Sequence, residues 1–360
     1  MTIHHLIARA KLCLALLIAA FAVGCANSDT DNTTAATPEI VLAYAHSTNY
    51  SSYTLDWIEK NGGSFSVQSS KLTLSASGLR SPTPVGNYLL VVDSSSTGRL
   101  IAYDKSSMAI AGQINVGSSP QDMVVVNSVA YIANGATGTN LLKRVDVSSL
   151  PAMTALSDIT VGNQPSVVRY YNGRIYVGNQ DWSNKIQATV SVINPATNSV
   201  EATFNTGPNN MDIAYDGTRI WTYNADWYNP TCQNNASLTY VSAATHTSPT
   251  NITPPTGYNT SSNCSKSGLA FNSTGGFVAL RHSSGAFHLF SINGTTLNNT
   301  PIDSTNRYVF VGNGSEYLYK IHNGDGSTNV LTVRIENLSG TALATLQLTK
   351  DNDMYFHVVK

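Results

Sequence analysis

A repeat of about 45 residues constrains this chain more than any other feature. The segment YVGNQDW at residues 176–182 returns 45 residues later as WTYNADW at residues 221–227, and weaker copies run along the chain. A period of this size is typical of β-propellers, in which each repeat is a four-stranded sheet that buries its faces against neighbouring repeats around a common axis. The repeat therefore predicts an all-β propeller, and it predicts the fold better than the chemistry.

The composition agrees with an exported all-β protein. Charged residues make up only 11% of the 360 residues, whereas Ser, Thr, Asn and Gly are abundant. The net charge is −1, and it falls to about −3 if residues 1–24, which carry Arg9 and Lys11, are removed. A nucleic-acid partner is therefore not expected, because such partners select a basic surface.

The first 25 residues resemble the signal of a bacterial lipoprotein. Arg9 and Lys11 precede an apolar run at residues 12–23 that is too short to span a bilayer stably. The run ends in AVGC, which resembles a lipobox, so Cys25 would carry the diacylglycerol that anchors the protein in the membrane. The alternative is an ordinary secretory cleavage site with an incidental cysteine.

The residues after the predicted lipidation site complete the domain organisation. The polar stretch that follows Cys25 has little apolar surface to bury, which predicts a flexible tether. Ala26 is not the aspartate that retains enterobacterial lipoproteins in the inner membrane, so we expect the outer membrane, on its periplasmic or its outer side. The predicted parts are a signal peptide (1–24), the lipidated cysteine with its tether (25–38) and a single propeller domain (39–360), which we expect to be monomeric.

Two cysteines would remain in the folded domain, Cys232 and Cys264, because Cys13 leaves with the signal and Cys25 is lipidated. In an oxidising compartment two such thiols should pair. The disulfide would close a long polar insertion and stabilise the fold by about 3–4 kcal/mol through loop-closure entropy. A metal site made of these two residues alone would lack further ligands.

Glycine and proline divide the chain into blades. The segments VGSSP (116–120), VGNQP (161–165) and TGP (206–208) each end an outer strand, and a proline then opens the next inner strand, where its missing N–H costs little. Residues 354–359 form a strand left over at the C-terminus, and we expect it to complete the first blade and close the ring. Seven blades are predicted, with six or eight as alternatives, near residues 39–80, 81–119, 120–164, 165–207, 208–264, 265–305 and 306–353.

Two segments carry a family resemblance: residues 190–203 (VSVINPATNSVEAT) and residues 174–179 (RIYVGN) resemble the repeat of YVTN-type propellers. The resemblance is good across about residues 85–210 and thinner across 265–360. It implies a seven-bladed propeller similar to YncE-like periplasmic proteins, surface-layer proteins and lactonase-like enzymes. Membership in such a fold family does not define a function.

The second strand of every blade ends on a polar residue, and these residues should gather on one face of the ring. Side chains of this kind often hold the following turn for purely local reasons. Alternatively, His46, His282, His322 and Asp93 could hold a divalent metal, because imidazoles with a carboxylate suit zinc, copper or iron. A polar small-molecule pocket is the third interpretation. The strand-end residues are His46, Asp93, Asn134, Asn179, Asn224, His282 and His322.

Two further groups of loop residues are candidates for ligand binding. An Asn-x-Asp-Trp segment occurs on adjacent blades, and a tryptophan beside a carboxylate could form a sugar or peptide platform or could cap its blade. Its two copies are Asn179, Asp181 and Trp182, and Asn224, Asp226 and Trp227. The blade-to-blade loops add residues near the mouth of the channel, where many propellers bind ligands. These are Gln121, Asp122, Asn209, Asn210, Lys266 and Arg307.

The sequence contains no recognisable catalytic motif: there is no G-x-S-x-G, H-E-x-x-H or phosphate-binding loop. We therefore expect a non-catalytic, membrane-anchored module that binds an envelope protein, an envelope polymer or a small ligand. The alternative from the family resemblance is a metal-dependent lactonase, in which Ca²⁺ held by Asn, Asp and Glu polarises the lactone. The ring offers Asp93, Asn134, Asn179 and Asn224 for that role but no glutamate. Metal handling with Zn²⁺ or Cu²⁺ through the three histidines is the third hypothesis.

Overall fold

The computed structural model describes residues 38–48, 52–74, 78–95, 97–136, 138–180, 188–225, 237–258, 268–282, 286–305, 308–314, 316–323, 329–350 and 353–358. The predicted signal peptide, Cys25, all of the tether before Pro38, Cys232 and Cys264 lie outside these residues, and their assignments stay predictions. Across the ranges given above, no helix is long and apolar enough to cross a membrane.

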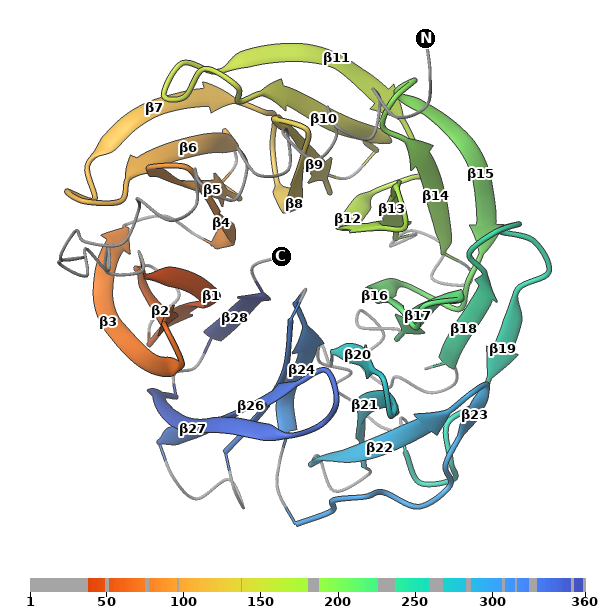
Figure 1. The fold of residues 1–360 in the computed structure, drawn as a ribbon. Helices are drawn as coiled ribbons and strands as arrows, with labels where there is room; N and C mark the ends of the chain where they lie inside the picture. The colour runs from red at the N-terminus through yellow and green to blue at the C-terminus, as the bar shows by residue number, and fades with distance from the viewer. Residues whose placement is uncertain are drawn as a thin grey trace, which may run out of the picture. The chain divides into compact units, whose positions relative to one another are not determined.

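The unit Pro38–Lys360 is a seven-bladed β-propeller, as the repeat predicts (Figure 1). The described strands form seven antiparallel four-stranded sheets, numbered here as blades 1 to 7 along the chain. From the innermost to the outermost strand, blade 1 consists of β28 (Asp353–Val358), β1 (Glu39–Ser47), β2 (Tyr53–Asn61) and β3 (Ser64–Leu74), and blade 2 consists of β4 (Leu79–Val85), β5 (Tyr88–Asp93), β6 (Arg99–Asp104) and β7 (Ile110–Asn115). Blade 3 consists of β8 (Pro120–Val126), β9 (Val129–Asn134), β10 (Leu141–Asp146) and β11 (Thr154–Thr160). Blade 4 consists of β12 (Pro165–Tyr171), β13 (Arg174–Asn179), β14 (Thr189–Asn194) and β15 (Ser199–Asn205).

The remaining three blades follow the same inner-to-outer order. Blade 5 consists of β16 (Asn210–Tyr215), β17 (Arg219–Asn224), β18 (Ser237–Ser242) and β19 (Thr250–Ile252). Blade 6 consists of β20 (Leu269–Asn272), β21 (Gly275–Arg281), β22 (Phe287–Asn293) and β23 (Thr296–Leu297). Blade 7 consists of β24 (Tyr308–Asn313), β25 (Tyr317–His322), β26 (Val330–Asn337) and β27 (Ala342–Thr349). Each predicted blade range holds the strands of one sheet, except that β4 begins two residues before its predicted boundary and that β28, in blade 1, comes from the C-terminal end of the domain.

The C-terminal strand closes the ring, which confirms the prediction made from the surplus strand. β28 pairs antiparallel with β1, with Ala43 opposite His357 and Tyr44 opposite Phe356. The first blade therefore combines strands from the two ends of the domain (Figure 1). This pairing removes the exposed sheet edge that an open blade would leave.

A backbone contact recurs at the start of the inner strand in blades 2 to 5. The residue just before the strand has a positive φ, and its carbonyl oxygen accepts a hydrogen bond from the N–H of the residue that follows the second strand. The accepting residues are Gly78 (φ 99°), Ser119 (φ 54°), Gln164 (φ 51°) and Asn209 (φ 40°). The donors, in the same order, are Ser94, Gly135, Gln180 and Ala225, at 3.0–3.1 Å. The contact fixes where each inner strand enters the ring.

The hydrophobic core lies between neighbouring blades. One cluster, for example, joins Trp221 and Leu238 of blade 5 to Phe271, Val278 and Phe290 of blade 6, and all five side chains are buried. Burial of a side chain of this size contributes about 1.5–3 kcal/mol. The buried side chains of the strands thus hold the blades face to face, and the inner strands lie around the axis.

Candidate ligand cavity on the propeller axis

The inner strands of all seven blades line one cavity of about 90 Å³. Its lining comes from β4, β8, β12, β16, β20, β24 and β28, the strands nearest the centre in Figure 1. One wall is polar and includes Arg169 and Asp212, and another is aromatic and includes Phe310 and Phe356. A concave site with an apolar wall and a few convergent polar groups is the usual form of a small-molecule site.

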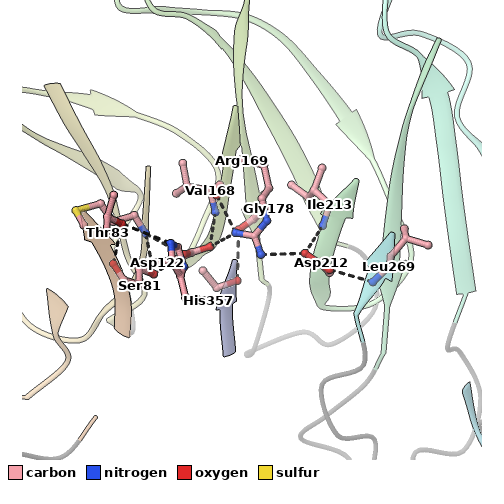
Figure 2. A network of polar contacts seen from close by, with 12 residues as sticks. Ser81, Thr83, Asp122, Val168, Arg169, Gly178, Asp212, Ile213, Leu269 and His357 are labelled. Carbon is pink, nitrogen blue, oxygen red and sulfur yellow. Dashed lines mark hydrogen bonds and ion pairs between the residues drawn. The ribbon is translucent and has the colours of Figure 1, made fainter. Parts of the chain in front are cut away.

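The polar wall is a continuous network of hydrogen bonds and ion pairs (Figure 2). The Ser81 hydroxyl donates to Asp122 Oδ1 at 2.5 Å, and Arg169 Nη1 donates to Asp122 Oδ2. Arg169 Nη2 donates to Asp212 Oδ1 at 3.0 Å. One guanidinium therefore joins two carboxylates from different blades, an arrangement in which charge-assisted hydrogen bonds are strong.

The two carboxylates also bind the backbone of the next blade. The N–H of Val168 donates to Asp122 Oδ2 at 3.0 Å, and the N–H of Leu269 donates to Asp212 Oδ2 at 3.1 Å. Ser81 has the same role in blade 2, where its hydroxyl oxygen accepts from the N–H of Met123 at 3.2 Å. The side chain at this place in an inner strand thus accepts a hydrogen bond from the backbone of the next blade.

Blade 4 shows why Arg169 is part of the network. The strand register places Val167 opposite Gly178, as Asp122 lies opposite Ala133 and Asp212 opposite Tyr223. Valine cannot accept the hydrogen bond that an aspartate accepts at this place. Arg169, two residues further along and on the same face of the strand, makes the link to blade 5 instead.

The charges of the network stabilise one another. Burial favours neutral Arg169, but the carboxylates of Asp122 and Asp212 outweigh this effect and raise the pKa of the guanidinium. Burial also favours neutral Asp122, but the charges of Arg169 and His357 and the hydrogen bond from Ser81 lower the pKa of its carboxyl. Burial raises the pKa of Tyr171, whose hydroxyl donates to the carbonyl of Ile213 at 3.3 Å.

The aromatic wall lies where blades 7 and 1 meet. The rings of Phe310 and Phe356 stack with centroids 5.3 Å apart, and Gly312 and Val358 line the cavity beside them. Tyr170 of blade 4 also lines the cavity and is 38% exposed. Thr83 Oγ1 of blade 2 lies 3.4 Å from His357 Nε2 of blade 1. The cavity therefore presents polar groups on one side and ring faces on another.

Of the residues that the sequence nominated for ligand binding, Asp122 belongs to the hydrogen-bond network of the polar wall, but neither it nor Asn179, Asn210 or Asn224 lines the cavity. Asn210 is fully buried against Gly178, and its carbonyl oxygen accepts a hydrogen bond from Gln180 Nε2 at 3.0 Å. Gln121 and Asn209 do not line the cavity either. The other nominated residues lie outside the described residues: Asp181, Trp182, Asp226, Trp227, Lys266 and Arg307.

The strand-end residues of blades 2 to 5 make local contacts, as the first of their three interpretations predicts. Asp93 accepts a hydrogen bond from the N–H of Ser95 and pairs with Arg99 at 2.8 Å. Asn134 donates to the carbonyl of Val116 at 3.1 Å. Asn179 and Asn224 each donate to residues of the third strand of their own blade: Thr189 and Ser191, and Ser237 and Thr239.

The three strand-end histidines have separate surroundings. His46 stacks on Tyr44 with centroids 4.7 Å apart and lies 3.3 Å from Asp56. His282 stacks on His288, and His322 lies beside Tyr308. Over the described part of the chain, no three His, Cys, Asp or Glu side chains come together in a way that could hold a metal ion. The structure therefore does not assemble His46, Asp93, His282 and His322 into one site.

Sequence reasoning missed Arg169, Asp212 and the aromatic wall. A signal for Asp212 was present, because Asp122 and Asp212 each stand two residues after the first residue of an inner strand. Arg169 gave no such signal, since it lies at a different place in its repeat. Phe310 and Phe356 are distant in the sequence, and only ring closure brings them together.

Comparisons with known proteins support the fold alone. No protein-family model matches the chain, and no curated protein matches it. Among solved structures, a chain of hydrazine synthase from Kuenenia stuttgartiensis is similar with a TM-score of 0.55 and 14% identity, over 83% of this chain and 93% of that one. The computationally designed Ika8 protein is similar with a TM-score of 0.53 and 9% identity, over 90% of this chain and 98% of that one.

Proposed function

We propose that this protein is an exported, lipid-anchored binding module whose small ligand occupies the cavity on the propeller axis. The observation that carries the proposal is the cavity itself, which all seven inner strands line and which joins a charged wall to an aromatic one. The lipobox-like segment that ends at Cys25, followed by Ala26 in place of an aspartate, supports an outer-membrane anchor, and the resemblance to YVTN-type propellers supports a place in the cell envelope. Both features are consistent with a receptor or scaffold held at the membrane.

The chemistry of the walls favours a neutral ligand with hydroxyl or amide groups. The charges of Arg169 and Asp212, which line the cavity, cancel when both are ionised, and Asp122, which does not line it, adds one negative charge, so the wall has no excess positive charge for an anion. Asp212 Oδ2 accepts one hydrogen bond, from Leu269, and a carboxylate oxygen has room for a second donor. The rings of Tyr170 and Phe356 would cover the apolar face of such a ligand.

A calorimetric titration tests the ligand class. The purified protein is titrated with glucose and N-acetylglucosamine as neutral probes, with glucuronate as the anion and with glucosamine as the cation. We expect binding of a neutral probe and about tenfold weaker binding in Tyr170→Ala, which removes the exposed ring from the cavity. Val200→Ala is the matched control, because Val200 is 37% exposed on the outer strand of the same blade. Binding that prefers glucuronate, or that Tyr170→Ala leaves unchanged, would contradict this site.

Lipidation is tested separately in the full chain. We expect radiolabelled palmitate to enter the wild-type protein and the protein to sediment with outer membranes, whereas Cys25→Ser abolishes both. Cys13→Ser is the control, since this residue lies inside the predicted signal. Unlabelled wild-type protein in the soluble periplasmic fraction would exclude the anchor and leave the ligand site to be judged by its own titration.

A further inference from the structure

Asn209 stands directly before β16, at the place that Gly78 and Ser119 occupy before the inner strands of blades 2 and 3. Its φ is 40°, and its carbonyl oxygen accepts a hydrogen bond from the N–H of Ala225 at 3.1 Å. Glycine and serine make the same backbone contact in blades 2 and 3. The turn needs a positive φ but no carboxamide, so the turn alone does not explain the side chain of Asn209.

The side chain of Asn209 buries a donor and an acceptor without pairing either of them. The residue is 2% exposed, and neither Nδ2 nor Oδ1 has a hydrogen-bond partner in the described part of the chain. A buried amide that loses its hydration without gaining a partner destabilises a fold, because the penalty for desolvation exceeds the gain from an ordinary hydrogen bond. Native proteins therefore pair almost all such groups, either with protein atoms or with ordered water.

Further unmet hydrogen-bonding capacity lies beside Asn209, at the junction of blades 4 and 5. Asn210 is fully buried, and its Oδ1 has no hydrogen-bond partner among the described residues. Gln180 of blade 4 donates from Nε2 to the Asn210 carbonyl at 3.0 Å, so carboxamide residues of both blades meet here. Asn209, Asn210 and Gln180 do not line the axial cavity. The junction is thus a buried polar site separate from the cavity.

We propose that Asn209 binds an internal water molecule at the junction of blades 4 and 5. One water molecule can donate to the oxygen of a carboxamide and accept from its N–H, so it serves both unpaired atoms at once. A cation would meet the Nδ2 donor and an anion would meet the Oδ1 acceptor, whereas water suits both. The burial of Asn209 and Asn210 excludes a larger ligand. Buried water makes about three hydrogen bonds, and Asn210 Oδ1 is a further unpaired acceptor within the same junction.

A high-resolution crystal structure of the full chain tests the assignment directly. We expect a water molecule within hydrogen-bond distance of both Oδ1 and Nδ2 of Asn209 in every copy of the chain. The assignment is wrong if the amide pairs with protein atoms instead, if an ion or another solute occupies the position, or if the two atoms face empty space.

Thermal unfolding of Asn209→Gly tests the energetic consequence. Ser119→Gly is the matched control, because it makes the same backbone change at the same place in blade 3, where φ is 54°. Loss of the hydrogen bonds to water should lower the melting temperature of Asn209→Gly by about 1–3 °C more than that of Ser119→Gly. A melting temperature equal to or above that of Ser119→Gly would overturn the proposal, because removal of an amide without a partner relieves its desolvation penalty.

Discussion

The inner ring of the propeller is held together differently in its two halves. In blades 2 to 5, the side chains of Ser81, Asp122, Arg169 and Asp212 link one inner strand to the next (Figure 2). Among the described residues of blades 6, 7 and 1, the inner strands are joined by close contacts of glycine with backbone and by stacked aromatic rings. Gly268 lies directly on the backbone of Val311, and Phe310 stacks on Phe356, whose strand β28 lies beside β24 near the centre of Figure 1.

The comparison shows that blades of the same repeat geometry can be held together by two kinds of contact, and that different substitutions should disrupt them. A carboxylate in the polar half serves several partners in different blades, so the loss of one member leaves the others buried without their counter-charge. The apolar half depends on shape, because close-packed surfaces gain many small contacts and tolerate no added volume.

Removal of the Arg169 guanidinium should show the difference between the two halves most clearly. Arg169→Met keeps the length of the side chain but leaves Asp122 and Asp212 facing one another without a positive charge. We expect a loss of about 3–5 kcal/mol in the free energy of unfolding, measured by urea denaturation followed by fluorescence.

Arg174→Met is the control for this variant. Arg174 is also in blade 4, but it pairs with Glu201 at the surface, where both side chains are about one-third exposed. Such a pair contributes at most about 1 kcal/mol. Equal stability of Arg169→Met and Arg174→Met would break the comparison, because it would mean that the polar half does not depend on its network.

The apolar half should respond most to added volume. The Cβ of an alanine at Gly268 would overlap the backbone carbonyl of Val311, which cannot move as a flexible side chain can. We expect Gly268→Ala to cost about 3 kcal/mol, at the upper end of the range for overpacked cores, and to lower the melting temperature. Gly63→Ala is the control, since a Cβ there meets nothing within 4 Å. A Gly268→Ala variant with the stability of the wild type would show that blades 6 and 7 are not closely packed at this contact.

The two halves should also differ in their response to acid. The pKa of Asp122 is lowered in the folded protein, so the carboxylate stabilises the fold above its unfolded pKa of about 3.9 and loses this contribution as the pH falls through its folded value. Asp122→Asn should therefore cost about 1.5–3 kcal/mol at pH 7, the usual contribution of a charge-assisted hydrogen bond. The difference from wild type should shrink below about pH 4.

Denaturation curves at several pH values measure this difference. Asp158→Asn is the control, because Asp158 pairs with Lys143 at the partly exposed outer edge of blade 3. A cost that stays constant between pH 7 and pH 3 would mean that Asp122 acts through its shape and not through its charge.

The fold was predictable from the sequence because glycine and proline recur at the boundaries between blades. Pro120 and Pro165 open inner strands 45 residues apart, and the surplus strand at residues 354–359 could only complete the blade that lacked one. These signals are local, or they count whole repeats. They predict the propeller, its closure and a count of seven blades, with six and eight left open, without knowledge of any side-chain contact.

The cavity was only partly predictable, because its contacts join different blades at different places in the repeat. Asp122 was nominated as a loop residue at the mouth, but its partner Arg169, which also donates to Asp212, could be found only from the register of the inner strands. The stacking of His282 on His288 was missed for the opposite reason. Alignment of strand ends compares His282 with residues of other blades, whereas its neighbour His288 lies on the next strand of the same blade.

The smallest effect should come from the strand-end residues, which lie outside the inner ring in both halves. Asn134 donates to the carbonyl of Val116 and accepts from the N–H of Ala136 at 3.3 Å, so its contacts are neutral and local to blade 3 and its preceding loop. We expect Asn134→Ala to cost about 1 kcal/mol, the typical net contribution of such hydrogen bonds, with unchanged binding at the axial cavity. A loss as large as that of Arg169→Met would extend the network outward from the inner strands and make the second strands part of the joint between blades.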